Sequence, residues 1–202
     1  MKPTLHTLSF LLLSFTYFPL AFTELVEDTD GNALFPGGKY YILPAISKGA
    51  GGGVKLAERS YCPVPVLQDY SEVDNGLPVH FSPIGQTIGY ISTDNLLEIA
   101  FHHKKPDCAE SPKWVLAVDG FPSPSISIGF IDPFQGNFKI VKNGNFGYKL
   151  QYCSPITVPP GTCHDIGRRN DKDGRRLVPT DENIKPFGVV FVHATENIRS
   201  VV

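Results

Sequence analysis

The chain lacks the short motifs that nucleotide-binding and hydrolytic enzymes carry. It has no G-x-x-x-x-G-K-[ST] phosphate loop and no G-x-S-x-G nucleophile turn. Closely spaced cysteine pairs, which are typical of structural zinc sites, are also missing. These absences argue against a nucleotide-dependent enzyme, a serine hydrolase with that turn and a zinc protein, so we expect neither a cofactor nor a metal.

The chain also lacks an excess of charge of either sign. Its 18 Lys and Arg residues are interspersed with 20 Asp and Glu residues, which gives a net charge of −2. No basic stretch without acids stands out as a patch that could attract nucleic acid or anionic lipid. We therefore expect no nucleic-acid partner.

Long apolar runs are confined to the first residues. Lys2 precedes an apolar run that is interrupted by Pro19 and ends in Ala21-Phe22-Thr23, a pattern typical of a secretory signal peptide. We expect residues 1–23 to be removed and residues 24–202 to form one domain, which is secreted or delivered to the vacuole. The mature chain then has no membrane-spanning stretch, and monomer is the default state.

Cysteine is scarce, and its number is informative. The four cysteines all lie in the mature part, and an even number in an oxidising compartment predicts two disulfides. Four cysteines allow three pairings, and their spacing alone does not choose among them. No N-x-[ST] sequon is present, so N-glycosylation is not expected.

Glycine and proline are plentiful and are spread along the chain. The 19 Gly and 18 Pro residues punctuate short stretches rich in β-branched and aromatic residues, which predicts many turns and an all-β fold, a closed antiparallel barrel or a sandwich. The glycine cluster Gly49–Gly53 is interpreted as a flexible loop. The predicted strands are 40–43, 64–68, 79–81, 96–101, 114–118, 138–141, 148–153, 176–178 and 188–192.

Several longer motifs lie along the mature chain. They are Val26-Glu27-Asp28-Thr29-Asp30-Gly31-Asn32, Phe35–Leu43, Lys113-Trp114-Val115, Gly147–Cys153, Cys163–Gly167, Gly174–Leu177 and Lys185–Phe191. Together these motifs resemble those of one family, the plant Kunitz inhibitors of the soybean trypsin inhibitor type, in a legume-like form, over essentially the whole mature chain. The resemblance implies a β-trefoil of twelve strands and the disulfides Cys62–Cys108 and Cys153–Cys163.

Inhibitors of this family present one exposed loop to the active site of a serine protease, and here residues 82–91 occupy its place. Counting forward from Ser82-Pro83 puts the specificity residue at Gly85, whereas counting back from Ile88-Gly89-Tyr90-Ile91 puts it at Thr87. The candidate contacts are therefore Ile84, Gly85, Gln86 and Thr87. None is Arg or Lys, whereas a trypsin pocket carries a carboxylate that needs a cation. We expect an inhibitor of non-tryptic specificity, directed at a small or apolar pocket.

A second departure from the family pattern is Pro36. Inhibitors of this family usually have an Asn at this position, and its side chain supports the loop backbone by hydrogen bonds. Proline has no amide to donate. We therefore expect weaker loop support and modest affinity.

A charged segment, 168–176, is a second candidate for protease contact. It is interpreted first as a solvated hairpin tip whose charges interact weakly. If protease binding uses this segment instead, Arg168 and Lys172 are the candidate contacts. Two other functions stay open: a β-trefoil binding or storage protein without a protease target, and a glycan-binding or glycan-active protein that uses acidic pairs such as Asp94 with Glu98.

Overall fold

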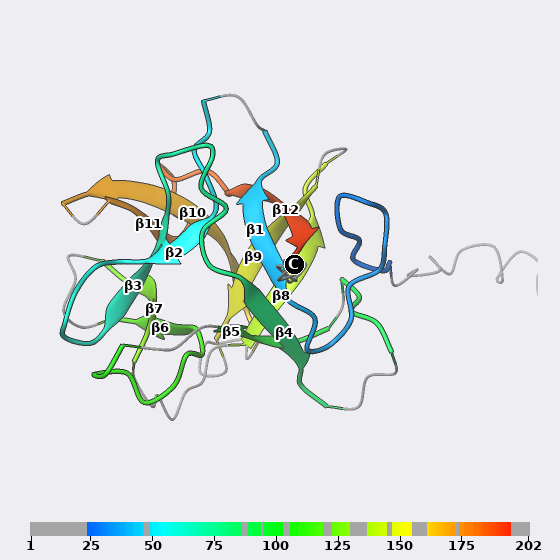
Figure 1. Ribbon diagram of the computed structural model, residues 1–202, viewed down its shortest axis with the longest axis horizontal. Coiled ribbons are helices and arrows are strands. Elements are labelled where there is room, and N and C mark those ends of the chain that lie inside the picture. The colour runs from blue at the N-terminus through cyan, green and yellow to red at the C-terminus, as the bar shows by residue number, and fades with distance from the viewer. Residues whose placement is uncertain are drawn as a thin grey trace, which may run out of the picture.

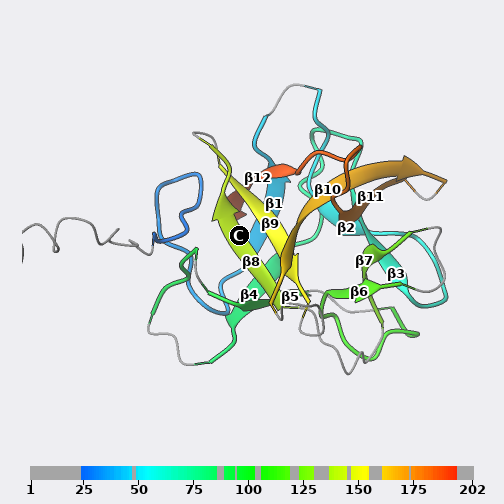
Figure 2. The same ribbon diagram turned by 180° about the vertical axis from the view of Figure 1, so that it is seen from behind.

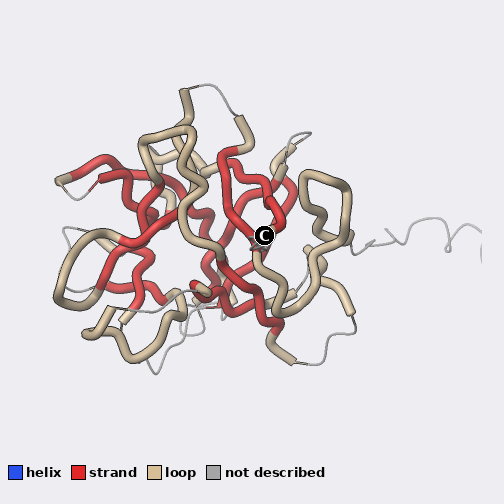
Figure 3. The backbone as a smooth tube through the Cα atoms, viewed as in Figure 1, coloured by secondary structure: helices blue, strands red, loops and turns tan. Residues whose placement is uncertain are grey.

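The protein is all-β. The computed structural model describes residues 24–46, 49–85, 89–93, 95–102, 106–118, 123–129, 137–144, 147–154, 161–172 and 174–194, and no helix occurs in these ranges (Figure 3). The strands are β1 (Tyr40–Pro44), β2 (Val54–Leu56), β3 (Val64–Gln68), β4 (Val79–Pro83), β5 (Leu97–Phe101), β6 (Val115–Ala117), β7 (Ser125–Ile128), β8 (Asn137–Lys142), β9 (Tyr148–Cys153), β10 (Cys163–Asp171), β11 (Gly174–Pro179) and β12 (Gly188–His193).

Six of the strands close into a barrel. Antiparallel pairing runs from β12 through β1, β4, β5, β8 and β9, and β9 pairs with β12 to complete the ring. Closure removes the unpaired edges that an open sheet would expose. The N-terminal residues contact this barrel through the hydrogen bond from the Thr29 amide to the Phe191 carbonyl of β12, at 2.9 Å.

The other six strands form three hairpins, β2–β3, β6–β7 and β10–β11, one in each consecutive group of four strands. The hairpins also pair with one another, β3 with both β7 and β11. Figure 1 shows them on the left of the barrel strands, and Figure 2 shows the same separation from behind. Three repeats of two barrel strands and one hairpin form a β-trefoil, as the resemblance implies.

The core follows the period of two along the barrel strands. In β12 the side chains of Val189 and Phe191 are buried, whereas that of Val190 between them is only partly buried. Phe191 packs edge-on against Phe81 of β4, with ring centroids 5.4 Å apart. In β1 the buried face is that of Tyr40 and Ile42.

Both implied disulfides are present. Cys62 is bonded to Cys108, and Cys153 to Cys163. The second pair joins residues that lie directly opposite each other in the β9–β10 ladder. The two cross-links therefore lie where the resemblance placed them.

The interpretation of Gly49–Gly53 as a flexible loop is wrong for Gly51, Gly52 and Gly53, which are buried. Gly53 donates a hydrogen bond to the Asp74 carbonyl and accepts one from the Asp69 amide, both at 2.8 Å. A β-carbon at Gly53 would collide with the Asn75 carbonyl. These glycines are thus needed for close backbone approach, not for mobility.

Candidate functional site

The candidate inhibitory loop leaves the barrel from β4. This strand is fully paired with β5, from Val79 opposite Phe101 to Pro83 opposite Leu97. One further hydrogen bond, from the Ile84 amide to the Leu96 carbonyl at 2.8 Å, continues the ladder beyond the strand. The chain is therefore held extended up to Ile84.

The loop rejoins the barrel at Ile91, whose side chain is fully buried. The Ile91 amide donates to the Leu34 carbonyl at 2.8 Å, and its carbonyl accepts from the Val26 amide at 2.9 Å. Two separate segments of the N-terminal region thus hold one residue. The loop is therefore anchored at this end as well as at its start.

The described residues at the two ends of the loop, 84–85 and 89–90, are exposed. The side chains of Ile84 and Tyr90 are 48% and 54% exposed, so both ends of the loop offer apolar surface. Gly85 and Gly89 have φ values of 95° and 81°, a conformation that suits glycine. The other two candidate contacts, Gln86 and Thr87, lie outside the described residues.

Pro36 lies in a tight turn next to the start of the loop. The Gly38 amide donates to the Phe35 carbonyl at 3.1 Å, and Gly37 has a φ of 79°, which makes a type II turn with Pro36 at its preferred position. The Gly37 amide also donates to the Phe81 carbonyl of β4, at 3.3 Å. Backbone groups, not a side-chain amide, thus connect this turn to the loop strand.

The same turn is packed against Tyr40. The Tyr40 hydroxyl accepts a hydrogen bond from the Phe35 amide at 3.2 Å. Burial is the main cause that raises the pKa of Tyr40, so this phenol stays neutral. A neutral, buried tyrosine therefore holds the residue before Pro36, a contact that sequence reasoning did not identify.

Comparisons with known proteins match this architecture over most of the chain. The family model for Kunitz inhibitors of the legume type, described as trypsin and protease inhibitor, matches residues 26–193. The chain belongs to the Kunitz family of trypsin and protease inhibitors. It has the β-trefoil fold of that family.

Individual relatives agree with the assignment to the Kunitz family. A Kunitz-type trypsin inhibitor-like protein of Pisum sativum is 47% identical over 97% of each chain. A subtilisin inhibitor of Canavalia lineata is 42% identical over 85% of this chain and 93% of its own. The crystal structure of a Kunitz-type trypsin inhibitor from Cicer arietinum, at 49% identity, covers 85% of this chain and 99% of its own with a TM-score of 0.75.

The second candidate segment is the hairpin of β10 and β11, which belongs to the part of this Kunitz protein farthest from the barrel strands in Figure 1. Arg168 is exposed, but its Nη1 donates to the Gln68 side-chain oxygen at 2.6 Å and to the Ala50 carbonyl at 3.2 Å. Its guanidinium also lies 4.6 Å from the ring centroid of Phe187. Arg168 is thus held in place, whereas Lys172 is exposed at the hairpin end.

The interpretation of this hairpin as a solvated tip with weakly interacting charges is wrong for Arg176. Only 1% of Arg176 is exposed, and its guanidinium is paired with the Asp171 carboxylate. Arg169 forms an ion pair with Asp181 at 3.0 Å. Charged residues of the segment therefore hold the hairpin together and join it to neighbouring segments. The candidate protease contacts Arg168 and Lys172 stay predictions.

No group of three or more potential metal ligands occurs among the residues that the structure describes. Of the acidic residues considered for glycan chemistry, Glu98 forms an ion pair with Lys113 at 2.8 Å, and Asp94 lies outside the described residues. Within the described ranges, no helix long and apolar enough to cross a membrane is found.

Proposed function

We propose that this protein inhibits a serine protease by inserting residues 84–87 into the active site in the manner of a substrate. The observation that carries the proposal is the anchoring of an exposed loop at both ends, by the Ile84–Leu96 hydrogen bond and by the buried Ile91. A loop that is ordered before binding loses little entropy when it docks. Gln86 and Thr87 enter this proposal from the sequence alone.

The target that fits the loop is an enzyme with a small or apolar specificity pocket, such as a subtilisin-like or elastase-like protease. Between Ser82 and Ile91 the sequence has no Arg or Lys to pair with the carboxylate of a trypsin pocket. The relative from Canavalia lineata, which is named a subtilisin inhibitor, supports this choice. Because no metal or catalytic group is invoked, the proposed role is that of an inhibitor and not of an enzyme.

We further propose that the functional form is residues 24–202, a secreted or vacuolar monomer. The support is the signal-like sequence of residues 1–23 and the even number of cysteines. Both disulfides of the structure are compatible with an oxidising compartment.

The test is a titration of purified residues 24–202 against a subtilisin-like protease, an elastase-like protease and trypsin. We expect stoichiometric inhibition of at least one of the first two and negligible inhibition of trypsin. Thr87→Arg should create trypsin inhibition if Thr87 occupies the specificity pocket, and Gln86→Arg is the matched control. We use Thr87 because Arg at Gly85 would be strained at its positive φ.

Two results would redirect the proposal. Tight trypsin inhibition that is lost in the double variant Arg168→Ala, Lys172→Ala would move the site to the β10–β11 hairpin. Absence of inhibition of all three enzymes would favour a binding or storage role. That alternative is supported by Pro36, which cannot provide the side-chain hydrogen bonds that support the loop in related inhibitors.

A further inference from the structure

A second site lies at the end of β1, away from the inhibitory loop. An open depression of about 830 Å³ is bordered by residues 44–46 and 49–50 and by the start of β12. Its walls include Pro44, Ile46, Pro186 and Phe187, and the charged residue that lines it is Arg168. Among the described residues, the depression therefore combines several apolar side chains with one cationic side chain.

The guanidinium of Arg168 is fixed before any ligand arrives. Its Nη1 donates hydrogen bonds to the Gln68 side chain and the Ala50 carbonyl, and its central carbon lies 4.6 Å from the centroid of the buried Phe187 ring. Contact with an aromatic ring orients an arginine as well as stabilising it. Arg168 therefore loses little rotational freedom on binding a ligand.

Within the described part of the chain, Arg168 has no ion-pair partner. Its hydrogen-bond partners are the neutral groups of Gln68 and Ala50, and a second cation, Arg175, repels it. Arg175 donates to the same Ala50 carbonyl at 2.8 Å. Partial desolvation of the guanidinium, followed by repulsion from Arg175, lowers the pKa of Arg168, and an anion bound beside the two arginines would offset this repulsion.

In Arg168 the edge of the guanidinium formed by Nε and Nη2 is available to bind an oxyanion. An arginine has five N–H donors, and the two described hydrogen bonds both use Nη1. Nε and Nη2 are left, and these two nitrogens together bind a carboxylate or sulfonate through two parallel hydrogen bonds. The side chain of Ile46, which is 72% exposed, would be covered by an apolar group attached to that anion.

We propose that this depression is a binding site for a small organic anion, in which Arg168 pairs with a carboxylate and the walls of Ile46, Pro44 and Phe187 enclose an apolar body. The ligand class is a monocarboxylate with a single ring or a short alkyl chain. An acidic side chain or the carboxyl end of a peptide carries the same group, but the limited size and the apolar walls of the depression favour the small molecule.

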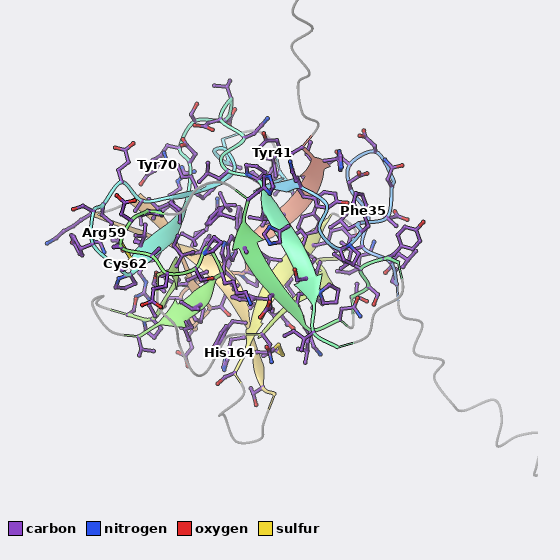
Figure 4. The ribbon with its side chains drawn as sticks, turned by 60° about the horizontal axis from the view of Figure 1, so that its bottom comes forward. Phe35, Tyr41, Arg59, Cys62, Tyr70 and His164 are labelled. Carbon is purple, nitrogen blue, oxygen red and sulfur yellow. A yellow bond between two sulfur atoms is a disulfide. The ribbon has the colours of Figure 1, made fainter. Side chains whose placement is uncertain are left out.

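The proposed site and the inhibitory loop are independent of each other. Figure 1 shows the segment after β1 at the top of the molecule and the loop after β4 at the bottom right. The second arginine that donates to the Ala50 carbonyl, Arg175, lies with its guanidinium carbon 4.5 Å from the ring centroid of Tyr70. Figure 4 shows Tyr70 at the opposite side of the molecule from Phe35 of the Pro36 turn. An anion could therefore bind while a protease occupies the loop.

The experiment is a calorimetric and NMR titration of residues 24–202 with phenylacetate. Acetate tests the charge without the apolar body, and phenethyl alcohol tests the apolar body without the charge. We expect saturable binding of one phenylacetate per chain, with acetate and phenethyl alcohol each at least about tenfold weaker. Shifts should concentrate on the amides of Ile46 and Phe187, and binding should weaken as salt rises.

Arg168→Gln should weaken phenylacetate binding about tenfold or more, because one charge-assisted pair is lost. Lys172→Gln is the matched control, since it removes the same charge from the same hairpin outside the depression, and it should change binding less than about twofold. If Arg168→Gln does not fold, Arg168→Lys serves instead, because it keeps the charge and loses the paired donors.

The proposal is overturned if no saturable binding occurs, if phenethyl alcohol binds as well as phenylacetate, or if the folded Arg168 variant binds unchanged. Stronger binding of an acidic peptide than of phenylacetate would overturn the choice of a small molecule. Protease inhibition measured in saturating phenylacetate should be unchanged. Failure of the anion site and failure of the inhibitory loop are therefore separate results.

Discussion

Replacement of Ile91 by alanine tests whether the buried end of the loop controls inhibition. The Ile91 side chain is fully buried and belongs to the main core cluster, and its backbone is held by Val26 and Leu34. Removing such a side chain leaves a cavity and costs about 2–5 kcal/mol of unfolding free energy. The backbone hydrogen bonds stay possible, but the chain at the loop end is no longer fixed by packing.

The matched control is Ile99→Ala. Ile99 is also fully buried in the same core, but it lies in β5, where its carbonyl accepts from the Trp114 amide. Both variants should lose similar stability, since they delete the same atoms from the same core. Only Ile91→Ala should release the loop, because Ile99 does not border it.

The readouts are urea unfolding and the dissociation rate from a subtilisin-like protease. A loop that must be ordered during docking costs about 0.5–1.5 kcal/mol for each side chain immobilised. We therefore expect Ile91→Ala to dissociate about 2- to 10-fold faster than the wild type, with a nearly unchanged association rate. Equal dissociation rates for Ile91→Ala and Ile99→Ala, at equal loss of stability, would refute the role of Ile91 in ordering the loop.

Three further predictions concern loop support, pH and the longer disulfide. Pro36→Asn should slow dissociation of a subtilisin-like protease and leave association nearly unchanged, and unchanged dissociation in a folded variant would show that loop support is not limiting. Burial and the charge of His102 lower the pKa of His80 in the folded chain. Below about pH 6.5 the unfolded chain therefore binds a proton at His80 more readily than the folded chain does. The free energy of unfolding should fall as pH decreases through this range. His80→Gln should reduce this dependence in urea unfolding at successive pH values, and an unaltered slope would assign it to other groups. Replacing both Cys62 and Cys108, 46 residues apart in sequence, by serine should cost about 4 kcal/mol of unfolding free energy in the loop-entropy model, and a loss below about 1 kcal/mol would contradict that model here.

The sequence determined the fold class and the chemistry of the candidate loop. Strands such as β3 and β9 could be located because their β-branched and aromatic residues lie between turn signals, which are local properties. The lack of a cation in the loop is likewise a property of composition and needs no coordinates. The pairing of the cysteines followed from the family resemblance, since spacing alone left three choices.

Some strands could not be located from local pattern. β7 (Ser125–Ile128) is buried at every position, so it shows no alternation, and two of its four residues are serines. β10 (Cys163–Asp171) contains charged residues that are typical of exposed turns. Both are strands because neighbouring strands pair with them, and such pairing depends on the whole chain.

Only the tertiary structure decided which residues support the loop and where an anion could bind. Ile91 is held by the N-terminal segment, and Arg168 reaches the Ala50 carbonyl across 118 positions of sequence. The buried glycines that bring Ala50 to this place have the composition of a flexible loop. The physical reason is that barrel closure and hairpin packing bring together groups that are far apart in the sequence, and their attraction depends on their distance in space. A local sequence pattern contains no information on that distance.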